Sequence, residues 1–291
     1  MIIKKYSISN WKVNREIKIA VFSDLHYSSL FKRRRFDDIL NTLRKDKPDY
    51  ICIPGDIVDD IGVLDIEDNC QELITFFKKL GSIATTFISI GNHDIKRIVN
   101  NRSFYDEKRT FKNKFDCLRG DNVILLDNEI YEIDNVRFIG FRLSFSYYYN
   151  LKSNEDLEML VKDFNENIEN FNDDKLNVLL CHSPICILDS YVIDRVKMLK
   201  NIDIVLSGHM HNGMVFSVID CIFPKNRGII APNKSLYPDN ARGIKKVKID
   251  NKEITLVISG GITKLSKSSV KLLHFGDYIY RPQIEYLMIK K

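Results

Sequence analysis

No apolar run in the 291 residues approaches the 18 or more that a membrane-spanning helix needs. The N-terminal stretch has no signal-peptide core, because charged and polar residues between Lys4 and Glu16 interrupt every apolar run. Internal repeats and low-complexity linkers are also absent from the sequence. We therefore expect a cytoplasmic protein with a single domain over residues 1–291; the mature form of a processed precursor is the alternative.

The six cysteines form no CxxC pair, and this spacing disfavours a zinc-thiolate site. Cys52 and Cys181 lie inside apolar, strand-like runs, so we expect small buried side chains in a reducing compartment. Cys181 lies next to a histidine and could therefore be a catalytic nucleophile. Its apolar neighbours predict instead that its side chain faces the core.

The net charge of +5 is modest, and the sequence has no dedicated nucleic-acid-binding tail. Positive charge gathers in Lys32–Arg35 and again between Arg242 and Lys252. Each cluster has two interpretations: a solvated surface, or attraction for an anionic substrate or a layer of membrane headgroups.

In the first half of the chain, short apolar runs alternate with segments whose apolar residues recur at helical spacing. Strands are expected at 17–22, 50–53 and 85–90, and helices at 36–44 and 70–80. Such alternation predicts right-handed crossovers and a largely parallel sheet.

The second half indicates a second sheet. Hairpin turns are expected at Asp134-Asn135 and at 250–252. The remaining expected elements are a long helix over Asp156–Phe171, buried strands at 176–180 and 204–206, a less regular run at 214–218, and a last, antiparallel strand at 284–289. The predicted fold class is α/β, a four-layer α-β-β-α sandwich of two mixed sheets with flanking helices.

Polar motifs follow five of the apolar strands. They are Ser23-Asp24-Leu25-His26, Gly55-Asp56, Gly91-Asn92-His93-Asp94, Cys181-His182-Ser183 and Gly208-His209-Met210-His211. Ligands bind at the carboxyl ends of strands in open α/β sheets, so one crevice should collect these side chains. An ordinary turn explains any single motif, but five such coincidences are improbable.

The candidate ligands are oxygen atoms and imidazole nitrogens, without thiolate. This set suits Mn, Fe or Zn, and its imidazole share argues against Ca²⁺ or a simple Mg²⁺ site. Asp24 and His26 share one side of an extended segment, as do His209 and His211. The motifs suffice for two metal ions with positions left for water and substrate, a type of site that hydrolyses phosphate esters.

In this order the motifs resemble the calcineurin-like metallophosphoesterase superfamily, from Asp24 to His211. Within the superfamily, the chain most resembles the bacterial branch of phosphohydrolases and phospholipid-headgroup phosphodiesterases. This narrower resemblance rests on Arg227-Gly228 and Ser259-Gly260-Gly261. Members of that branch often carry Gly-His-Thr-His-Gly-Gly, where this chain has Gly-His-Met-His-Asn-Gly.

The resemblance implies a role for each motif residue. One metal ion would be held by Asp24, His26, Asp56 and His211. The other would be held by Asp56, Asn92, His182 and His209, so that Asp56 bridges the two. His93 would face the substrate and stabilise or protonate the leaving oxygen. Asp94 would pair with His93 and hold its tautomer.

The expected activity is that of a dinuclear-metal phosphohydrolase cleaving phosphate mono- or diesters, diesters favoured, through attack by a metal-activated hydroxide. A DNA nuclease and a non-catalytic, metal-dependent scaffold of the same fold are the alternatives. A serine/threonine protein phosphatase is disfavoured, because that branch has Glu where this chain has Asp94. The expected partner is a small-molecule or lipid-linked phosphate ester, with peripheral membrane contact as a further expectation.

Three other features each have two interpretations. His274 is expected to be structural rather than a ligand, because its neighbours are apolar. Tyr147-Tyr148-Tyr149 either lines the cleft or packs its rings on the surface. The proline-rich segment Ile219–Arg242 is expected to be a loop beside the cleft, either a lipid-tolerant lip or a packed connection between strands.

Overall fold

The computed structural model describes residues 1–28, 31, 33–100, 102–105, 112–143, 148, 158, 161–162, 165–166, 171, 174–188, 190–195, 197–263 and 281–291. The expected helix over 156–171 falls mostly outside the described residues, and His274, Tyr147 and Tyr149 fall outside them entirely.

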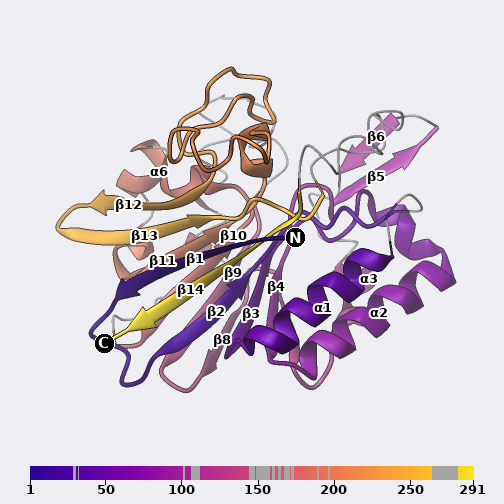
Figure 1. Cartoon of the computed structure of the whole chain (residues 1–291), viewed down its shortest axis with the longest axis horizontal. Helices are drawn as coiled ribbons and strands as arrows, with labels where there is room; N and C mark the ends of the chain where they lie inside the picture. The colour runs from indigo at the N-terminus through magenta and orange to yellow at the C-terminus, as the bar shows by residue number, and fades with distance from the viewer. Residues whose placement is uncertain are drawn as a thin grey trace.

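A six-stranded mixed sheet contains both ends of the chain (Figure 1). Its strands, in spatial order, are β1 (Ile2–Ser9), β14 (Gln283–Lys290), β2 (Ile17–Val21), β3 (Tyr50–Pro54), β4 (Thr85–Ser89) and β7 (Val123–Leu126). Only β14 and β2 pair in antiparallel fashion, and the other neighbours are parallel. The parallel strands β2, β3 and β4 therefore present their carboxyl ends at the same edge.

A second six-stranded mixed sheet comes from the second half of the chain. Its order is β12 (Gly243–Ile249), β13 (Lys252–Ile258), β11 (Ile204–Ser207), β10 (Leu176–Cys181), β9 (Val136–Phe141) and β8 (Ile130–Ile133). The two edge pairs are antiparallel hairpins, as the sequence predicted, and the central pairs are parallel. A small hairpin, β5 (Lys96–Val99) and β6 (Arg102–Tyr105), stands apart from both sheets.

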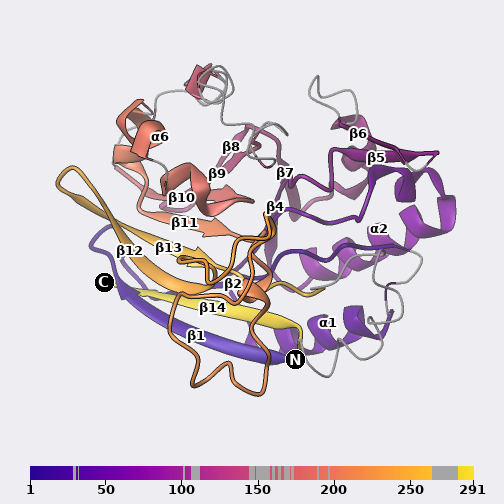
Figure 2. The ribbon, with the colours of Figure 1, turned by 90° about the horizontal axis from the view of Figure 1, so that it is seen from above.

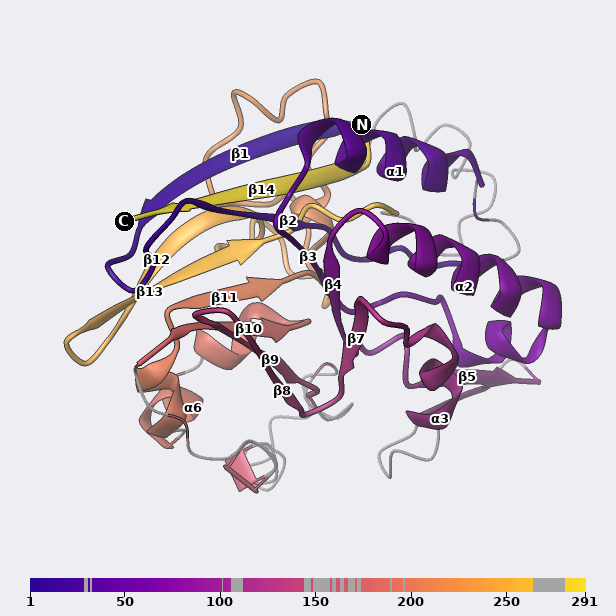
Figure 3. The ribbon, with the colours of Figure 1, turned by 90° about the horizontal axis from the view of Figure 1, so that it is seen from below.

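The helices lie outside the two sheets. Seen from above and from below, α1 (Arg34–Asp46) and α2 (Glu67–Gly81) lie beside the first sheet, and α6 (Ser190–Arg195) lies beside the second (Figures 2 and 3). The short segments are α3 (Lys112–Phe115) and the single-turn helices η1 (Ile61–Asp65), η2 (Asp116–Leu118), η3 (Pro184–Ile187), η4 (Lys197–Asn201) and η5 (His211–Met214). No helix among the described segments has both the length and the apolar character needed to cross a bilayer.

Three apolar clusters join these parts. Phe87 of β4 stacks on Phe138 of β9 between the sheets, with ring centroids 3.9 Å apart. Phe36 of α1 stacks on Phe76 of α2 outside the first sheet, at 4.0 Å. The third cluster lies outside the second sheet and includes Cys181, which is buried there as predicted. Burial of this aromatic and aliphatic surface is the main favourable term that holds the sheets together.

The expected elements recur with ends shifted by a few residues, and α1 buries Phe36, Ile39, Leu40 and Leu43 along one face. The run at 214–218 is not a strand: it follows η5 and continues as an irregular loop. The strands β1, β5, β6 and β7 were not predicted. Among them, β1 pairs with β14, more than 270 residues away in sequence, a partner that no local pattern could reveal.

Candidate metal centre

The five predicted motifs all begin where a buried strand ends. Asp24, Asp56 and Asn92 follow β2, β3 and β4 of the first sheet, whereas His182 and His209 follow β10 and β11 of the second. The two sheets thus both deliver polar side chains to one site. The expectation that the motifs share one crevice is borne out by the contacts among them described below.

The backbone is left-handed at five of the motif residues. The φ angles are 55° at Asp24, 46° at His26, 55° at Asp56, 67° at His209 and 47° at His211. Residues with a Cβ atom seldom adopt this conformation, which costs on the order of 1 kcal/mol or more per residue. Such clustered strain is typical of functional sites, where the turn directs side chains toward one point.

Gly91 allows two of these turns to approach each other closely. A Cβ atom at position 91 would lie 2.2 Å from Oδ1 of Asp56 and 2.5 Å from its main-chain nitrogen. Any larger residue would therefore push the Gly55-Asp56 turn away from the Gly91-Asn92 turn. The glycine of the Gly-Asn-His-Asp motif is a packing requirement of the site.

Two buried carboxylates lie at the middle of the histidines. Nε2 of His182 is 3.0 Å from Oδ2 of Asp56 and 3.8 Å from Oδ1 of Asp24. Nε2 of His26 is 3.8 Å from Oδ1 of Asp24 and 3.6 Å from Oδ2 of Asp56. Nε2 of His211 is 3.7 Å from Oδ1 of Asp24. Three sets of potential ligand atoms lie within 4.8 Å of one another: Asp24–His26–His211, Asp24–Asp56–His182 and His26–Asp59–His93. The first two include the central carboxylates.

Main-chain carbonyl groups orient two of the imidazole rings. Nδ1 of His182 is 2.7 Å from the carbonyl oxygen of Pro54, and Nδ1 of His211 is 3.0 Å from that of Thr263. In neutral rings, Nδ1–H donates to these carbonyl groups, which leaves the Nε2 lone pair directed at the carboxylates. Histidines that bind metals are commonly held in this way.

The residues fit bound metal ions because several buried polar atoms have no partner in the chain. Neither ring nitrogen of His26 has a hydrogen-bond partner, and the same is true of His182 Nε2 and Asn92 Oδ1. Buried polar atoms normally have a partner, since leaving one unpaired costs about 1–3 kcal/mol. Metal coordination would satisfy Nε2 of His26, Nε2 of His182 and Oδ1 of Asn92, whereas Nδ1 of His26 lies 3.8 Å from Oδ1 of Asp59.

The pKa values of Asp56, His209 and His211 match ligand chemistry, whereas burial of His182 is outweighed by the carboxylates of Asp56 and Asp24, which raise its pKa to about 9. Burial would raise the pKa of Asp56, but His182 and His93 hold it well below its ordinary value. Burial lowers the pKa of His209 to about 3 and that of His211 to about 4. The carboxylate is thus ionised and both rings are neutral near pH 7, as metal binding requires.

Asn92 and His209 occupy the second half of the site. The His209 ring lies 5.2 Å from that of His182, and its main-chain nitrogen is 3.3 Å from both carboxylate oxygens of Asp24. Asn92 lines the same pocket as Asp56 and His209. The structure therefore gathers all seven predicted metal ligands.

Asp94 does not pair with His93, which corrects the expectation for this residue. Its carboxylate accepts hydrogen bonds from four main-chain N–H groups, those of Asp56, Ile57, Val58 and Gly91, at 2.8–3.0 Å. It thereby fastens the Gly55-Asp56 turn to the Gly91-Asn92 turn. His93 instead places Nδ1 2.8 Å from the carbonyl oxygen of Asp59 and 3.5 Å from its Oδ1. The sequence offered one signal for Asp59, an acidic residue three positions after Asp56.

A pocket of about 540 Å³ opens over these residues. Its lining includes Asp56, Asn92, His93, His209 and His211, together with Tyr148 and the segment 232–234. Tyr148 therefore lines the cleft, one of the two alternatives for the tyrosine run. The segment Ile219–Arg242 is irregular, lies beside the cleft as expected, and forms the orange loops at the top of Figure 1. It contributes Lys234, which the sequence had not singled out.

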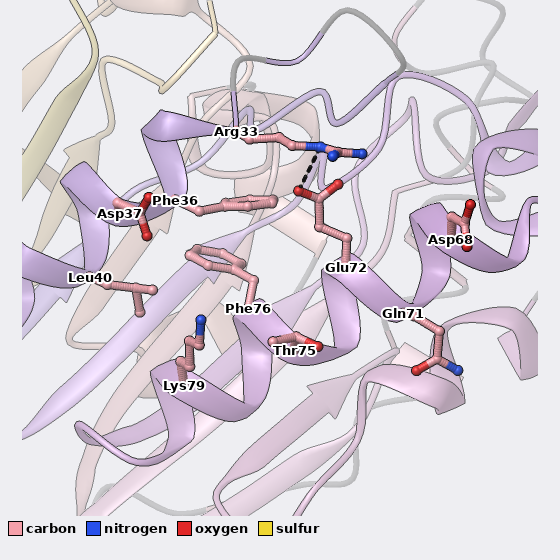
Figure 4. A pocket seen from close by; sticks show the side chains of 10 residues that line it. All are labelled: Arg33, Phe36, Asp37, Leu40, Asp68, Gln71, Glu72, Thr75, Phe76 and Lys79. Atoms are coloured by element: carbon pink, nitrogen blue, oxygen red, sulfur yellow. Dashed lines mark ion pairs between the residues drawn. The ribbon is translucent and has the colours of Figure 1, made fainter.

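A separate pocket of about 550 Å³ lies between α1 and α2 and shares no lining residue with the metal centre (Figure 4). Arg33 crosses its rim to form an ion pair with Glu72 at 3.0 Å. Arg35 is buried and donates a hydrogen bond to Thr263 at 2.7 Å. Two members of the predicted basic cluster thus have partners within the chain, which favours a structural interpretation for them.

The chain is also similar in sequence to known proteins. The model of the calcineurin-like phosphoesterase family matches residues 17–213. An uncharacterized metallophosphoesterase of Aquifex aeolicus is 28% identical over 258 residues, covering 83% of this chain and 84% of that protein. One of Helicobacter pylori is 24% identical over 74% of this chain, but the chain spans only 50% of that relative. The DNA polymerase II small subunit of Methanocaldococcus jannaschii is 22% identical over 82% of this chain and 41% of its own length.

Among solved structures, a dimetal phosphatase from Danio rerio has a TM-score of 0.44 at 12% identity, covering 86% of this chain and 89% of that one. The family match spans more than half of the chain and includes all five motifs. The chain belongs to the calcineurin-like phosphoesterase family.

Proposed function

We propose that this chain is a dinuclear-metal phosphohydrolase that cleaves phosphate esters, with diesters favoured over monoesters. The observation that carries the proposal is the convergence of three Nε2 atoms, those of His26, His182 and His211, on the buried carboxylates of Asp24 and Asp56. One ion would be held by Asp24, His26, Asp56 and His211, and the other by Asp56, Asn92, His182 and His209. The ligand types suit Mn, Fe or Zn.

Two ions bound here would acidify a coordinated water and neutralise the phosphoryl oxygens. The chain's own residues supply the rest. Asp94 fixes the two turns that carry Asp56 and Asn92. His93 lines the pocket, and its Nδ1 is held by Asp59, so that Nε2 is available to the leaving oxygen. Burial lowers the pKa of His93, but Asp56 and Asp59 outweigh it and raise the pKa, which favours a ring that carries a proton to donate.

The charge of the pocket supports the preference for diesters. Among the described lining residues, Lys234 is the one lysine or arginine. A monoester dianion brings one charge more than a diester and so needs more compensation than a single lysine beside the metal ions provides. A diester monoanion is the better match.

Hydrolysis of paired chromogenic substrates tests the proposal. The metal-loaded protein should hydrolyse bis-p-nitrophenyl phosphate faster than p-nitrophenyl phosphate, and chelation should abolish both activities. Turnover that survives complete metal removal would refute the proposal. Two metal ions per chain without turnover of either ester would favour the non-catalytic scaffold.

Peripheral contact with a membrane, and hence a lipid-linked substrate, is part of the same proposal. Ile222 is 79% exposed and Tyr237 68%, both in the segment that borders the cleft, and Val218, one residue before that segment, is 81% exposed. Lysines 225 and 234 in the same segment are exposed. Exposed apolar side chains combined with positive charge suit an anionic bilayer surface. Binding to phosphatidylglycerol vesicles should weaken in the Val218→Ser/Ile222→Ser double variant, and equal binding would contradict the contact.

Two features of the fold complete the proposal. We infer that the whole of residues 1–291 forms one domain. The helices beside the second sheet would complete a four-layer α-β-β-α sandwich, supported by Val192 of α6 and Leu199 of η4 in the cluster outside that sheet.

A further inference from the structure

We infer that a second pocket beside the metal centre binds the ester group that stays on phosphorus after cleavage, and that this group is uncharged and about the size of one ring. The inference rests on the proposed function, in which His93 faces the leaving oxygen. It names a part of the substrate that a phosphodiester has and a phosphomonoester lacks.

The second pocket adjoins the first. It has a volume of about 320 Å³ and shares Tyr148, His209, Pro232 and Asn233 with the pocket over the metal centre. A substrate bound at the metal ligands can therefore extend into it past the His209 ring. A volume of this size accepts one ring or a short branched chain rather than a polymer.

The pocket is lined by His209 and not by His93. The His93 ring meets the His26 ring at 4.5 Å, and His26 in turn stacks on His211 at 5.3 Å. The second pocket is bordered by His209, whose ring meets those of His182 and Tyr148 at 5.2 and 5.1 Å. His93 does not line it. If His93 serves the leaving oxygen, the group in this pocket is the other ester substituent.

The lining excludes a second anion. Its walls are mostly apolar and include Leu188, Met210 and Pro238, and its described lining contains no lysine or arginine. The one acidic group, Asp239, forms an ion pair with Arg227 at 2.8 Å. An additional phosphate or carboxylate on the substituent would lose its hydration there without gaining a cation. An uncharged group loses less and buries apolar surface.

One wall is a preformed hairpin tip, Ala231–Ser235. The main-chain nitrogen of Ala231 donates to the carbonyl of Ser235, and that of Lys234 to the carbonyl of Ala231, both at 2.9 Å. Asn233 Oδ1 accepts from the main-chain nitrogen and the hydroxyl of Ser235. These bonds hold Lys234 at a φ of 65°. Because this wall is already ordered, little conformational entropy is lost when the substrate binds.

The test keeps the leaving group constant and varies the retained group. Methyl p-nitrophenyl phosphate and phenyl p-nitrophenyl phosphate both release p-nitrophenol. The phenyl ester should have the higher kcat/KM, by on the order of tenfold or more, because only its ring fills the pocket. Equal values for the two esters would overturn the inference, whereas chelator-sensitive hydrolysis of both would leave the proposed function standing.

Pocket-filling variants locate the effect. Ala231→Phe places a ring in the pocket, and Ile230→Phe places the same ring on the neighbouring residue, which does not line it. The phenyl-to-methyl ratio should fall toward one in Ala231→Phe and keep its wild-type value in Ile230→Phe. Ser235→Trp, with Leu236→Trp as its control, repeats the comparison at exposed positions, where folding is not at risk. A ratio unaffected in both pocket variants would refute the assignment.

Binding provides a readout that does not depend on turnover. Diphenyl phosphate should bind the metal-loaded protein more tightly than dimethyl phosphate in calorimetric titrations, and Ser235→Trp should remove the difference. Tighter binding of diphenyl phosphate in a protein that hydrolyses no ester would contradict the proposed function but support the pocket assignment. Equal affinities of the two diesters for the wild-type protein would defeat the pocket assignment.

Discussion

Nδ1 of His93 lies 2.8 Å from the main-chain carbonyl oxygen of Asp59, and the carboxylate of the same residue adds a contact at 3.5 Å. The ring is thus held from one side by a residue that is itself buried, while its other edge faces the pocket. The same carboxylate lies 3.8 Å from Nδ1 of His26, so Asp59 contacts both the ring that would act on the substrate and one of the rings that would hold a metal ion.

Replacing His93 by alanine should remove proton donation and leave metal binding intact. We expect turnover of a p-nitrophenyl diester to fall by about 10²–10⁴-fold. The metal content, measured by elemental analysis, should equal that of the wild-type protein. Unimpaired turnover, or loss of a metal ion, would contradict the role given to this residue.

Asp59→Asn should have a smaller effect than His93→Ala, because the main-chain carbonyl that accepts from Nδ1 remains. The variant loses only the negative charge beside the ring, so kcat should fall by about tenfold or less while KM and metal content are retained. Steady-state kinetics on the same diester measures the split between kcat and KM. A fall as large as that of His93→Ala would show that the carboxylate, not the carbonyl, positions the ring.

Asp94→Asn should damage folding rather than catalysis alone. An asparagine side chain turns one of its two acceptor oxygens into a donor, which leaves about two of the four main-chain N–H groups unsatisfied. The free energy of unfolding should fall by about 2–5 kcal/mol, and metal content should fall with it because the turns separate. Urea denaturation provides the measurement. A fully stable, metal-replete but inactive variant would instead support the pairing with His93 that the sequence suggested.

Asp220 should couple the cleft-bordering segment to the rest of the fold in a pH-dependent way. Its carboxylate binds Lys4 of β1 at 3.0 Å, Asn212 at 2.8 Å, and Arg242. Burial opposes ionisation, but the hydrogen bond from Asn212 and the charges of Lys4 and Arg242 lower the pKa of Asp220. A lowered folded-state pKa stabilises the protein above the unfolded value of about 3.9, and this contribution disappears as the pH falls through the folded value.

Asp220→Asn should therefore cost about 1–3 kcal/mol near pH 7. The difference between wild type and variant should stay constant down to about pH 5 and shrink below about pH 4, where the wild-type carboxylate itself becomes protonated. Denaturation curves across this range measure the difference. A difference that grows as the pH falls would contradict the assignment.

The sequence predicted the strands that carry the site because each is a short, continuous apolar run followed by a polar turn. The motif residues lie within a few positions of those runs, so local pattern alone locates Asp24, Asn92 and His182. Strand β1 was not predicted because none of its residues is fully buried: half-buried and exposed positions alternate along it. Its pairing with β14 joins opposite ends of the chain.

Contacts between distant segments account for the remaining errors. Asp94 follows His93 in sequence, but the turn points its carboxylate at main-chain N–H groups near residue 57, and Asp59 takes the place beside the ring. Lys234 lines the cleft because it lies at the tip of a hairpin. The sequence of that segment predicted only a proline-rich loop. Neither arrangement follows from spacing, since both depend on how separate loops meet.

Metal stoichiometry of wild type and Asp56→Asn tests the central claim most directly. Asp56 lies between the two sets of ligands, within 3.6 Å of His26 and 3.0 Å of His182. We predict two metal ions per wild-type chain after reconstitution with Mn²⁺, and fewer than two, with loss of diester hydrolysis, in the variant. Two ions retained by Asp56→Asn, or a wild-type chain that binds none, would contradict the assignment of a dinuclear centre.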